Sequence, residues 1–128
     1  IHAVRAAKKE GILPGGGSAL VHVANSDWQM KLNPGELKGV SILKQSLYAP
    51  FLLILSNAGL NSAEYTDLGK GCHGVDVIDG KIKNMCEAGI IDPLLVTKSA
   101  LQNAISVATT ILSTDCVISN VRENEGNR

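Results

Sequence analysis

Pro14-Gly15-Gly16-Gly17 separates two stretches with helical patterning, and this glycine run constrains how the chain folds around it. Glycine adopts positive φ angles at little cost, so successive N–H groups in such a run can point toward one ligand. A helix beginning at Ser18 would add the positive end of its dipole. The run therefore predicts either a contact with phosphate, ribose or carboxylate oxygens, or a tight helix-to-helix connection without a ligand. The glycines alone favour the connection.

The run does not match two common phosphate-binding motifs. The Gly-Lys-Ser/Thr of a Walker A motif does not follow it. No strand is predicted before it, although a dinucleotide-binding fingerprint requires one. A ligand contact at this loop would therefore be of another kind.

The composition narrows the kinds of protein that this chain can be. Its 128 residues amount to about one domain, although Ile1 already lies inside an amphipathic helical pattern, which predicts a piece of a longer protein. Lysine plus arginine equals aspartate plus glutamate at 12 each, so neither nucleic acid nor a membrane is an expected partner. The longest apolar run, Phe51–Leu55, is too short to span a bilayer. Cys72, Cys86 and Cys116 are widely spaced, which predicts no disulfide framework and a reducing compartment.

The hydrophobic periodicity predicts a mainly α fold. Gly11 is expected to end the first helix and to form a bend. Helices are predicted over residues 2–10, 18–24, 36–57 with a break after Ala49, 62–68 with Ser62 as N-cap, 81–88, and 92–113. A loop is predicted over 25–35, a short β-hairpin over 74–80, and a terminal strand over 114–121. That strand has no partner of comparable length in this sequence, so its partner is expected elsewhere.

The candidate polar residues each allow a structural and a functional interpretation. Asp92 precedes Pro93, a pattern typical of a helix N-cap, but a carboxylate can also accept two sugar hydroxyls. Asp76 and Asp79 fall in the predicted hairpin, where aspartate is common for turn reasons. The histidines and cysteines lack metal-ligand spacing, and no nucleophile motif is present, so neither a metal site nor a catalytic residue is predicted.

Four segments carry a family resemblance when taken in order. They are AAKKEGILPGGGSAL (6–20), LKQSLYAPFLLILSNAG (43–59), HGVDVIDGKIKNMCEAGIIDPLLVTKSALQNAISVA (73–108) and LSTDCVI (112–118). Together they resemble the C-terminal part of a group I chaperonin, one of the GroEL-type ring chaperones of bacteria, mitochondria and plastids. The most specific pieces are EGILPGGG and AGIIDPLLVTKSALQNA.

The resemblance implies the C-terminal half of a chaperonin equatorial-domain helical bundle, with a short β-hairpin and a terminal strand. Residues 1–10 would end the intermediate domain's helix, and 11–121 would belong to the ATP-binding, ring-forming equatorial domain. Residues 122–128 would be a flexible tail. Gly11 would then lie at the hinge between the two domains, and the terminal strand would pair with a neighbouring subunit.

The resemblance also implies half of an ATP site. Gly16 would contact the ribose through its backbone, and Asp92 would bind the ribose hydroxyls. Asp76 and the backbone of Val77 would frame the adenine, with Ile90 against the base. The phosphates and Mg²⁺ would be held by an acidic-glycine-threonine loop from another part of the protein.

The family's hydrolytic aspartate would lie two positions before Ile1, so ATP hydrolysis by this chain alone is not expected. Three positions depart from the family pattern. Val75 stands where a tyrosine is frequent, which removes an aromatic surface near the nucleotide. Leu52 and Asn61 replace an arginine and a glutamate that help to hold two rings together, which suggests a single-ring or altered assembly.

The implied function is that of an ATP-dependent ring chaperonin that assists protein folding and refolding. The implied partners are other chaperonin subunits, together with unfolded client proteins and a co-chaperonin bound through other domains. The implied compartment is the cytoplasm, the mitochondrial matrix or the plastid stroma. Two alternatives are an ATPase-inactive module that associates with chaperonin subunits and an unrelated helical nucleotide-binding domain.

Overall fold

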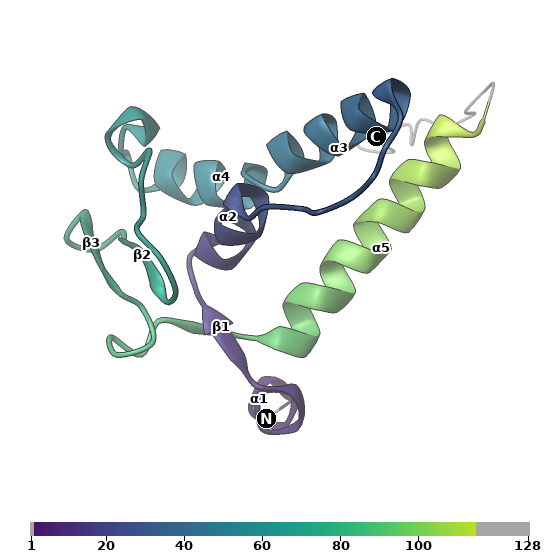
Figure 1. The fold of residues 1–128 in the computed structure, drawn as a ribbon. Coiled ribbons are helices and arrows are strands. Elements are labelled where there is room, and N and C mark those ends of the chain that lie inside the picture. Colours follow the sequence, from purple (N-terminus) through teal and green to yellow (C-terminus); the bar gives the residue numbers. More distant parts are fainter. Residues whose placement is uncertain (1, 115–128) are drawn as a thin grey trace, which may run out of the picture. The chain divides into compact units, whose positions relative to one another are not determined.

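The computed structural model describes residues 2–114, and its ribbon is drawn in Figure 1. The chain divides after Val96 into two compact units, each considered by itself. The elements are α1 (His2–Glu10), β1 (Ile12–Pro14), α2 (Ser18–Asn25), α3 (Pro34–Ser46), α4 (Ala49–Asn57), the 3-10 turn η1 (Ser62–Glu64), β2 (His73–Asp76), β3 (Lys81–Asn84), β4 (Ile91–Pro93) and α5 (Leu94–Leu112). The predicted mainly α class is confirmed. The predicted terminal strand and tail fall almost wholly outside the described residues, and the domain assignment stays a prediction.

The first helix ends where the sequence predicts. Gly11 has a φ of +98°, and its N–H donates to Ala7 O at 2.9 Å, closing the last turn of α1. The chain then enters β1, which pairs antiparallel with β4, so that Leu13 lies opposite Asp92. A strand therefore does precede the glycine run, and that premise of the sequence analysis is wrong. The dinucleotide fingerprint remains unmatched, because Leu20 stands at the position of its third glycine.

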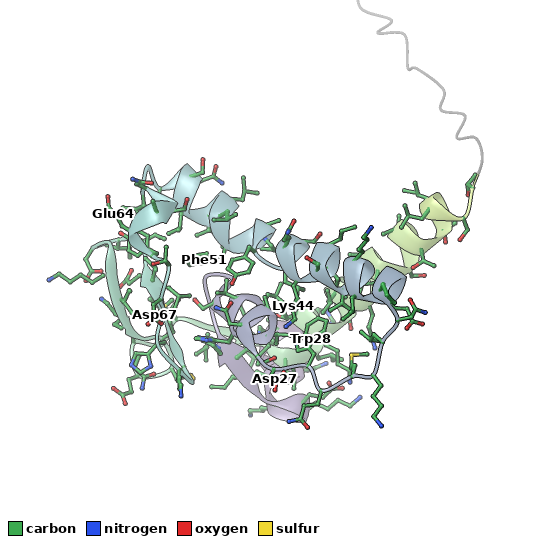
Figure 2. All side chains as sticks on the ribbon, turned by 45° about the horizontal axis from the view of Figure 1, so that its top comes forward. Asp27, Trp28, Lys44, Phe51, Glu64 and Asp67 are labelled. Atoms are coloured by element: carbon green, nitrogen blue, oxygen red, sulfur yellow. A yellow bond between two sulfur atoms is a disulfide. The ribbon has the colours of Figure 1, made fainter. Side chains whose placement is uncertain are left out.

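The core of the first unit forms where α2 and α4 meet the hairpin. The buried side chains are Val21, Phe51, Leu55, Leu68 and Val75, and Leu55 is fully buried. Figure 2 shows Phe51 on the side of α4 that faces α2. Val75 is thus a core residue of this chain.

The helical region predicted over 36–57 is two helices. The break lies at Leu47 and Tyr48 rather than after Ala49, and Pro50 occupies the first turn of α4, where a missing N–H costs nothing. By length and composition, Pro34–Asn57 is the candidate membrane span among the described residues. Core helices of soluble proteins meet the same criterion.

The loop predicted over 25–35 is shorter, because α2 includes Asn25 and α3 already begins at Pro34. Asn33 and Glu36 form a capping box: Asn33 Oδ1 accepts from Glu36 N, and Glu36 Oε2 accepts from Asn33 N, both at 2.9 Å. This Asn-x-x-Glu pattern was visible in the sequence.

The helix predicted over 62–68 is wrong beyond its first turn. The single turn η1 is capped by Asn61, not Ser62, since Asn61 Oδ1 accepts from Ala63 N at 3.1 Å. Tyr65 then leaves the helical path, and its hydroxyl donates to Gly80 O at 2.9 Å. This contact with the hairpin overrides the local helical preference.

The helix predicted over 81–88 is also wrong. Residues 81–84 form β3, which pairs antiparallel with β2 and places Val75 opposite Ile82. The predicted hairpin exists, but 77–80 are its turn rather than its second strand. Asp92 is not the N-cap of the long helix, because its backbone belongs to β4 and α5 begins at Leu94.

Cys72 and Cys86 are joined in a disulfide with a Cα–Cα separation of 5.8 Å. The prediction of no disulfide framework did not include this bond. The reason is the unpredicted strand β3: it folds the chain back, so that Met85 N donates to Cys72 O at 2.8 Å. Sequence spacing alone could not indicate this proximity.

Candidate functional site

The glycine run is packed against the protein's own backbone. Gly15 N donates to Ile90 O at 2.9 Å, and a Cβ on Gly15 would lie 3.0 Å from that same oxygen. Gly17 has a φ of +76°, and a Cβ there would lie 2.8 Å from Phe51 N. Close packing thus requires a glycine at position 17 and favours one at position 15, which supports the interpretation of the run as a tight connection.

Gly16 faces the hairpin. Its φ is +66°, and a Cβ on it would lie 3.4 Å from Met85 Cε and 3.6 Å from Val75 O. These contacts bring the loop beside the residue that precedes Asp76. Met85 itself is fully buried, and the sequence analysis did not single it out because it was assigned to a helix.

The predicted site residues come from three parts of the chain. Gly16 lies on the loop, and Asp76 ends β2. Ile90 directly precedes β4, and Asp92 lies within it. The hydrogen bond from Gly15 to Ile90 joins the glycine loop to the residue before β4. The packing of Gly16 joins the same loop to the hairpin. The glycine loop therefore lies between the two other parts.

Val77 is partly buried and packs against the hydrophobic core, so its side chain is directed inward. This leaves its backbone as the part of Val77 available to a ligand. The Asp92 side chain is half-buried, and no hydrogen bond to its carboxylate is found within residues 2–114. Such a carboxylate can accept hydrogen bonds from a ligand.

Asp76 and Asp79 form a charge cluster with Lys83. Lys83 Nζ donates to Asp76 Oδ2 at 2.8 Å and to Asp79 Oδ2 at 2.7 Å. Asp76 Oδ1 accepts from Ile78 N, and Asp79 Oδ1 accepts from Lys81 N, both at 3.0 Å. These backbone bonds confirm the turn role predicted for both aspartates.

The hydrogen bonds from Lys83, followed by those from the backbone, lower the pKa of both aspartates from the ordinary value of 3.8. The same two hydrogen bonds raise the pKa of Lys83. Asp76 therefore presents an ionised, acceptor-only carboxylate at the end of β2. Lys83 was missed as a partner because the sequence analysis assigned it to a helix.

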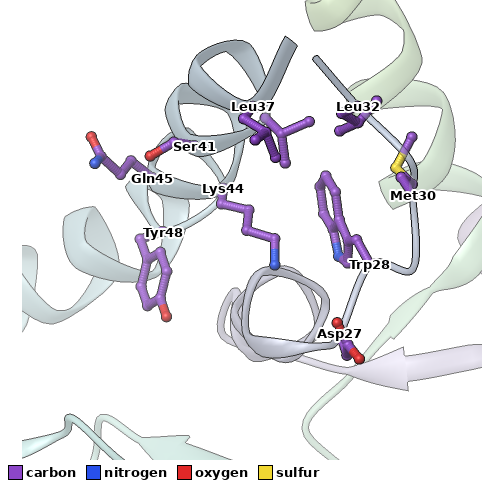
Figure 3. A pocket seen from close by; sticks show the side chains of 10 residues that line it. Asp27, Trp28, Met30, Leu32, Leu37, Ser41, Lys44, Gln45 and Tyr48 are labelled. Atoms are coloured by element: carbon purple, nitrogen blue, oxygen red, sulfur yellow. The ribbon is translucent and has the colours of Figure 1, made fainter. Parts of the chain in front are cut away.

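A pocket of about 360 Å³ lies elsewhere in the first unit (Figure 3). Its walls come from the loop after α2 and from α3, and none of the predicted site residues lines it. Lys44 Nζ lies 4.8 Å from the centre of the Trp28 ring and donates to Ser26 O at 3.0 Å. Trp28 Nε1 donates to Val23 O at 2.9 Å. These contacts hold Trp28 in a loop whose Met30 and Leu32 line the same pocket.

Within the described residues, no group of three or more His, Cys, Asp or Glu side chains could hold a metal ion. The Asp76–Asp79–Lys83 cluster contains two carboxylates, and Lys83 neutralises part of their charge. The candidate site thus consists of carboxylates that accept hydrogen bonds, apolar side chains, and the backbone of the glycine loop.

Comparison with known proteins relates the chain to a family model and to curated relatives. The model of the TCP-1/cpn60 chaperonin family matches residues 1–122. The protein named "Chaperonin GroEL, chloroplastic" from Cyanidium caldarium is 41% identical over 133 residues, which cover 99% of this chain and 25% of the relative. The chain thus spans about a quarter of the length of that curated relative.

Proposed function

This chain belongs to the TCP-1/cpn60 chaperonin family, and we propose that it supplies the ribose and adenine half of the ATP site in a ring-forming chaperone that assists protein folding. The observation that carries the proposal is the position of the glycine loop between the hairpin and the start of β4. Gly16 packs beside Val75 O, and Gly15 N donates a hydrogen bond to Ile90 O. Residues far apart in sequence are thereby gathered around one loop.

Each proposed contact suits the chemistry of a nucleoside. The backbone of Gly16 contacts the ribose closely. The two carboxylate oxygens of Asp92 accept hydrogen bonds from the two ribose hydroxyls. Ile90 offers an apolar surface to the base, while Asp76 and the backbone of Val77 frame its edge. The phosphates and Mg²⁺ are held by parts of the protein outside this chain.

Nucleotide binding then acts on the assembled ring. ATP biases rigid-body movement about hinges, and Gly11 is one such hinge between α1 and β1. A Cβ on Gly11 would meet no atom within 4 Å, and the Gly11 carbonyl accepts a hydrogen bond from Leu94 N at 3.1 Å. The partners are other chaperonin subunits, unfolded clients and a co-chaperonin. The chloroplastic relative favours the plastid stroma among the predicted compartments.

Calorimetric titration with ATP tests the proposal in rings assembled from subunits that contain this chain. Asp92→Asn should weaken ATP binding about tenfold, because a charged acceptor for the ribose is lost. Asp27→Asn is the matched control, since Asp27 is exposed in the loop after α2 and should leave ATP binding unchanged.

The same titration separates the proposal from the alternative of an ATPase-inactive interaction module. Assembled rings that bind no ATP would establish that alternative. Equal ATP affinity of the Asp92→Asn and unmodified rings would remove Asp92 from the site. The isolated chain is expected to bind no tighter than about millimolar, because it holds half of the contacts.

A further inference from the structure

The disulfide lies at the open end of the β2–β3 hairpin. Cys72 directly precedes β2, and Cys86 follows β3 after Met85. Their Cα–Cα separation of 5.8 Å is in the usual range for a disulfide. Both cysteines are partly exposed, so a thiol can reach the bond.

A series of backbone hydrogen bonds connects this disulfide to the glycine loop. Met85 N donates to Cys72 O at 2.8 Å, Ile90 N donates to Met85 O at 2.9 Å, and Gly15 N donates to Ile90 O at 2.9 Å. Met85 and Ile90 each donate to one member of the series and accept from another. The position of Gly15 therefore depends on how firmly Met85 is held.

The side chain of Met85 makes a second connection. It is fully buried, and its Cε lies 3.4 Å from where a Cβ on Gly16 would stand. Its Cγ lies 2.8 Å from the corresponding position at Gly74 in β2. Met85 is thus enclosed between the hairpin and the glycine loop, directly beside the disulfide-bonded Cys86.

The hairpin depends on support of this kind. Each strand has four residues, and a two-stranded hairpin of that size is marginally stable by itself. A cross-link between its ends restricts the opened hairpin more than the closed one, and so disfavours opening. Reduction of the disulfide should release the end of the hairpin from which Met85 extends.

We propose that Cys72 and Cys86 are a reversible dithiol–disulfide pair that controls the order of the hairpin and the glycine loop. In the oxidised form the loop is held in the arrangement described above, and in the reduced form it loosens. The effect on nucleotide binding rests on the proposed function, whereas the effect on order does not.

A low-molecular-weight disulfide such as oxidised glutathione is the chemical class of oxidant. One cysteine thiolate attacks this disulfide, breaks its S–S bond and releases one thiol. The second thiolate attacks the mixed disulfide, forms the Cys72–Cys86 bond and releases the second thiol. The protein gives up two electrons, and its two protons pass to the released thiols. A dithiol reductant reverses both steps.

Hydrogen exchange of the full chain tests the pair, with oxidised glutathione or dithiothreitol setting the redox state. The amides of Gly15, Met85 and Ile90 should exchange at least about tenfold more slowly in the oxidised form. The α3 amides are the internal control and should not change.

Serine variants show which cysteine thiols cause the redox dependence of amide exchange. Cys116→Ser should respond like the unmodified chain, whereas Cys72→Ser and Cys86→Ser should exchange rapidly in both conditions. Equal exchange of the unmodified chain in the two states would overturn the proposal. A disulfide to Cys116 in peptide mapping of the oxidised chain would also overturn it.

ATP titration of assembled rings in both redox states separates this inference from the proposed function. Tighter ATP binding by oxidised rings, together with slower exchange, supports both. Slower exchange with no ATP binding in either state keeps the redox pair and overturns the nucleotide site. Equal exchange with equal ATP binding keeps the nucleotide site and overturns the redox pair.

Discussion

Two regions of the first unit are held together in different ways. The glycine-loop core, comprising the glycine loop, α2, α4 and the hairpin, is joined by buried side chains, backbone hydrogen bonds and a disulfide. The α3 segment, residues 26–46, has no buried residue in its helix and is held by exposed side-chain contacts such as those of Trp28 and Lys44. The difference indicates that the proposed nucleotide site lies on the more rigid region, as a preorganised site requires.

The largest difference between the regions should appear on truncation of apolar side chains. Leu55 in α4 is fully buried, so Leu55→Ala should lower the free energy of unfolding by about 2–5 kcal/mol. Ile42 in α3 is 65% exposed, so Ile42→Ala should change it by less than about 0.5 kcal/mol. Urea unfolding of both variants measures this. Equal losses would show that the α3 segment is packed as firmly as the core.

A methyl group added to a glycine should have opposite effects in the two regions. A Cβ at Gly74 would lie 2.1 Å from Ser18 Oγ, so Gly74→Ala should cost about 1–3 kcal/mol of stability. Gly39 in α3 has open space around it, so Gly39→Ala should gain about 0.5–1 kcal/mol through helix propensity.

Ser18→Ala sharpens this test, because the Ser18 hydroxyl is the nearest of the clashing atoms, while Met85 Cγ and Ser18 Cβ, both at 2.8 Å, remain. Combined with Gly74→Ala, it should recover part of the lost stability in a double-mutant cycle. The Ser18 Oγ is buried without a hydrogen-bond partner among the described residues, so its removal alone should cost little. Strict additivity of the two changes would argue against a direct clash.

The α3 segment should instead be sensitive at its cap. Asn33→Ala removes one side of the capping box and should cost about 1 kcal/mol of helix stability. Asn33→Asp is the control, since aspartate keeps the acceptor. Circular dichroism and exchange of the α3 amides measure the loss, which should leave the hairpin amides unaffected. Loss of hairpin protection would show that the two regions unfold as one unit.

The smallest effect should come from the partly buried charge cluster of Asp76, Asp79 and Lys83. The pKa of Asp76 and Asp79 is lowered by Lys83, so their stabilisation is present above pH 3.8 and is lost as the pH falls below it. The pKa of Lys83 is raised above 10.5, so its contribution is lost as the pH rises through that raised value.

Titration of both carboxyl groups by NMR measures these pKa shifts. The Lys83→Met variant removes the hydrogen bonds that Lys83 donates to the two aspartates. The variant should return the pKa of Asp76 and Asp79 toward 3.8, because their largest cause of lowering is removed. Unchanged pKa values would assign the lowering to the backbone N–H groups of the turn instead.

The sequence predicted the secondary structure well where it depends on residues close together in the chain. The periodicity of residues 2–10 and 18–24 gave α1 and α2 nearly to their ends, and Gly11 closed the first of them. It failed where a distant contact decided the outcome. Residues 81–84 have helical spacing but pair with β2, and Tyr65 turns away from a helix to reach Gly80. A partner far along the chain outweighs a weak local preference in both cases.

The candidate site divides in the same way. The family resemblance implied a nucleoside site at Gly16, Asp76 and Asp92 before any geometry was known, whereas the residue types alone favoured structural roles. The partners of those residues were not predictable: Asp92 was expected to cap a helix but lies in β4, and Lys83 was expected on a helix but binds two aspartates. Strands of three or four residues are too short to be recognised from alternation.

By itself, the sequence determined the chaperonin family from the order of several segments, and the mainly α class and the glycine run from residue types and spacings within single segments. The tertiary structure alone decided the pairing of β1 with β4, the disulfide, and the close contacts of Gly15 and Gly17 with Ile90 and Phe51. These join residues that the chain separates widely, so their energy appears only once the intervening segments have folded. The glycines are needed chiefly because this backbone packs so closely upon itself.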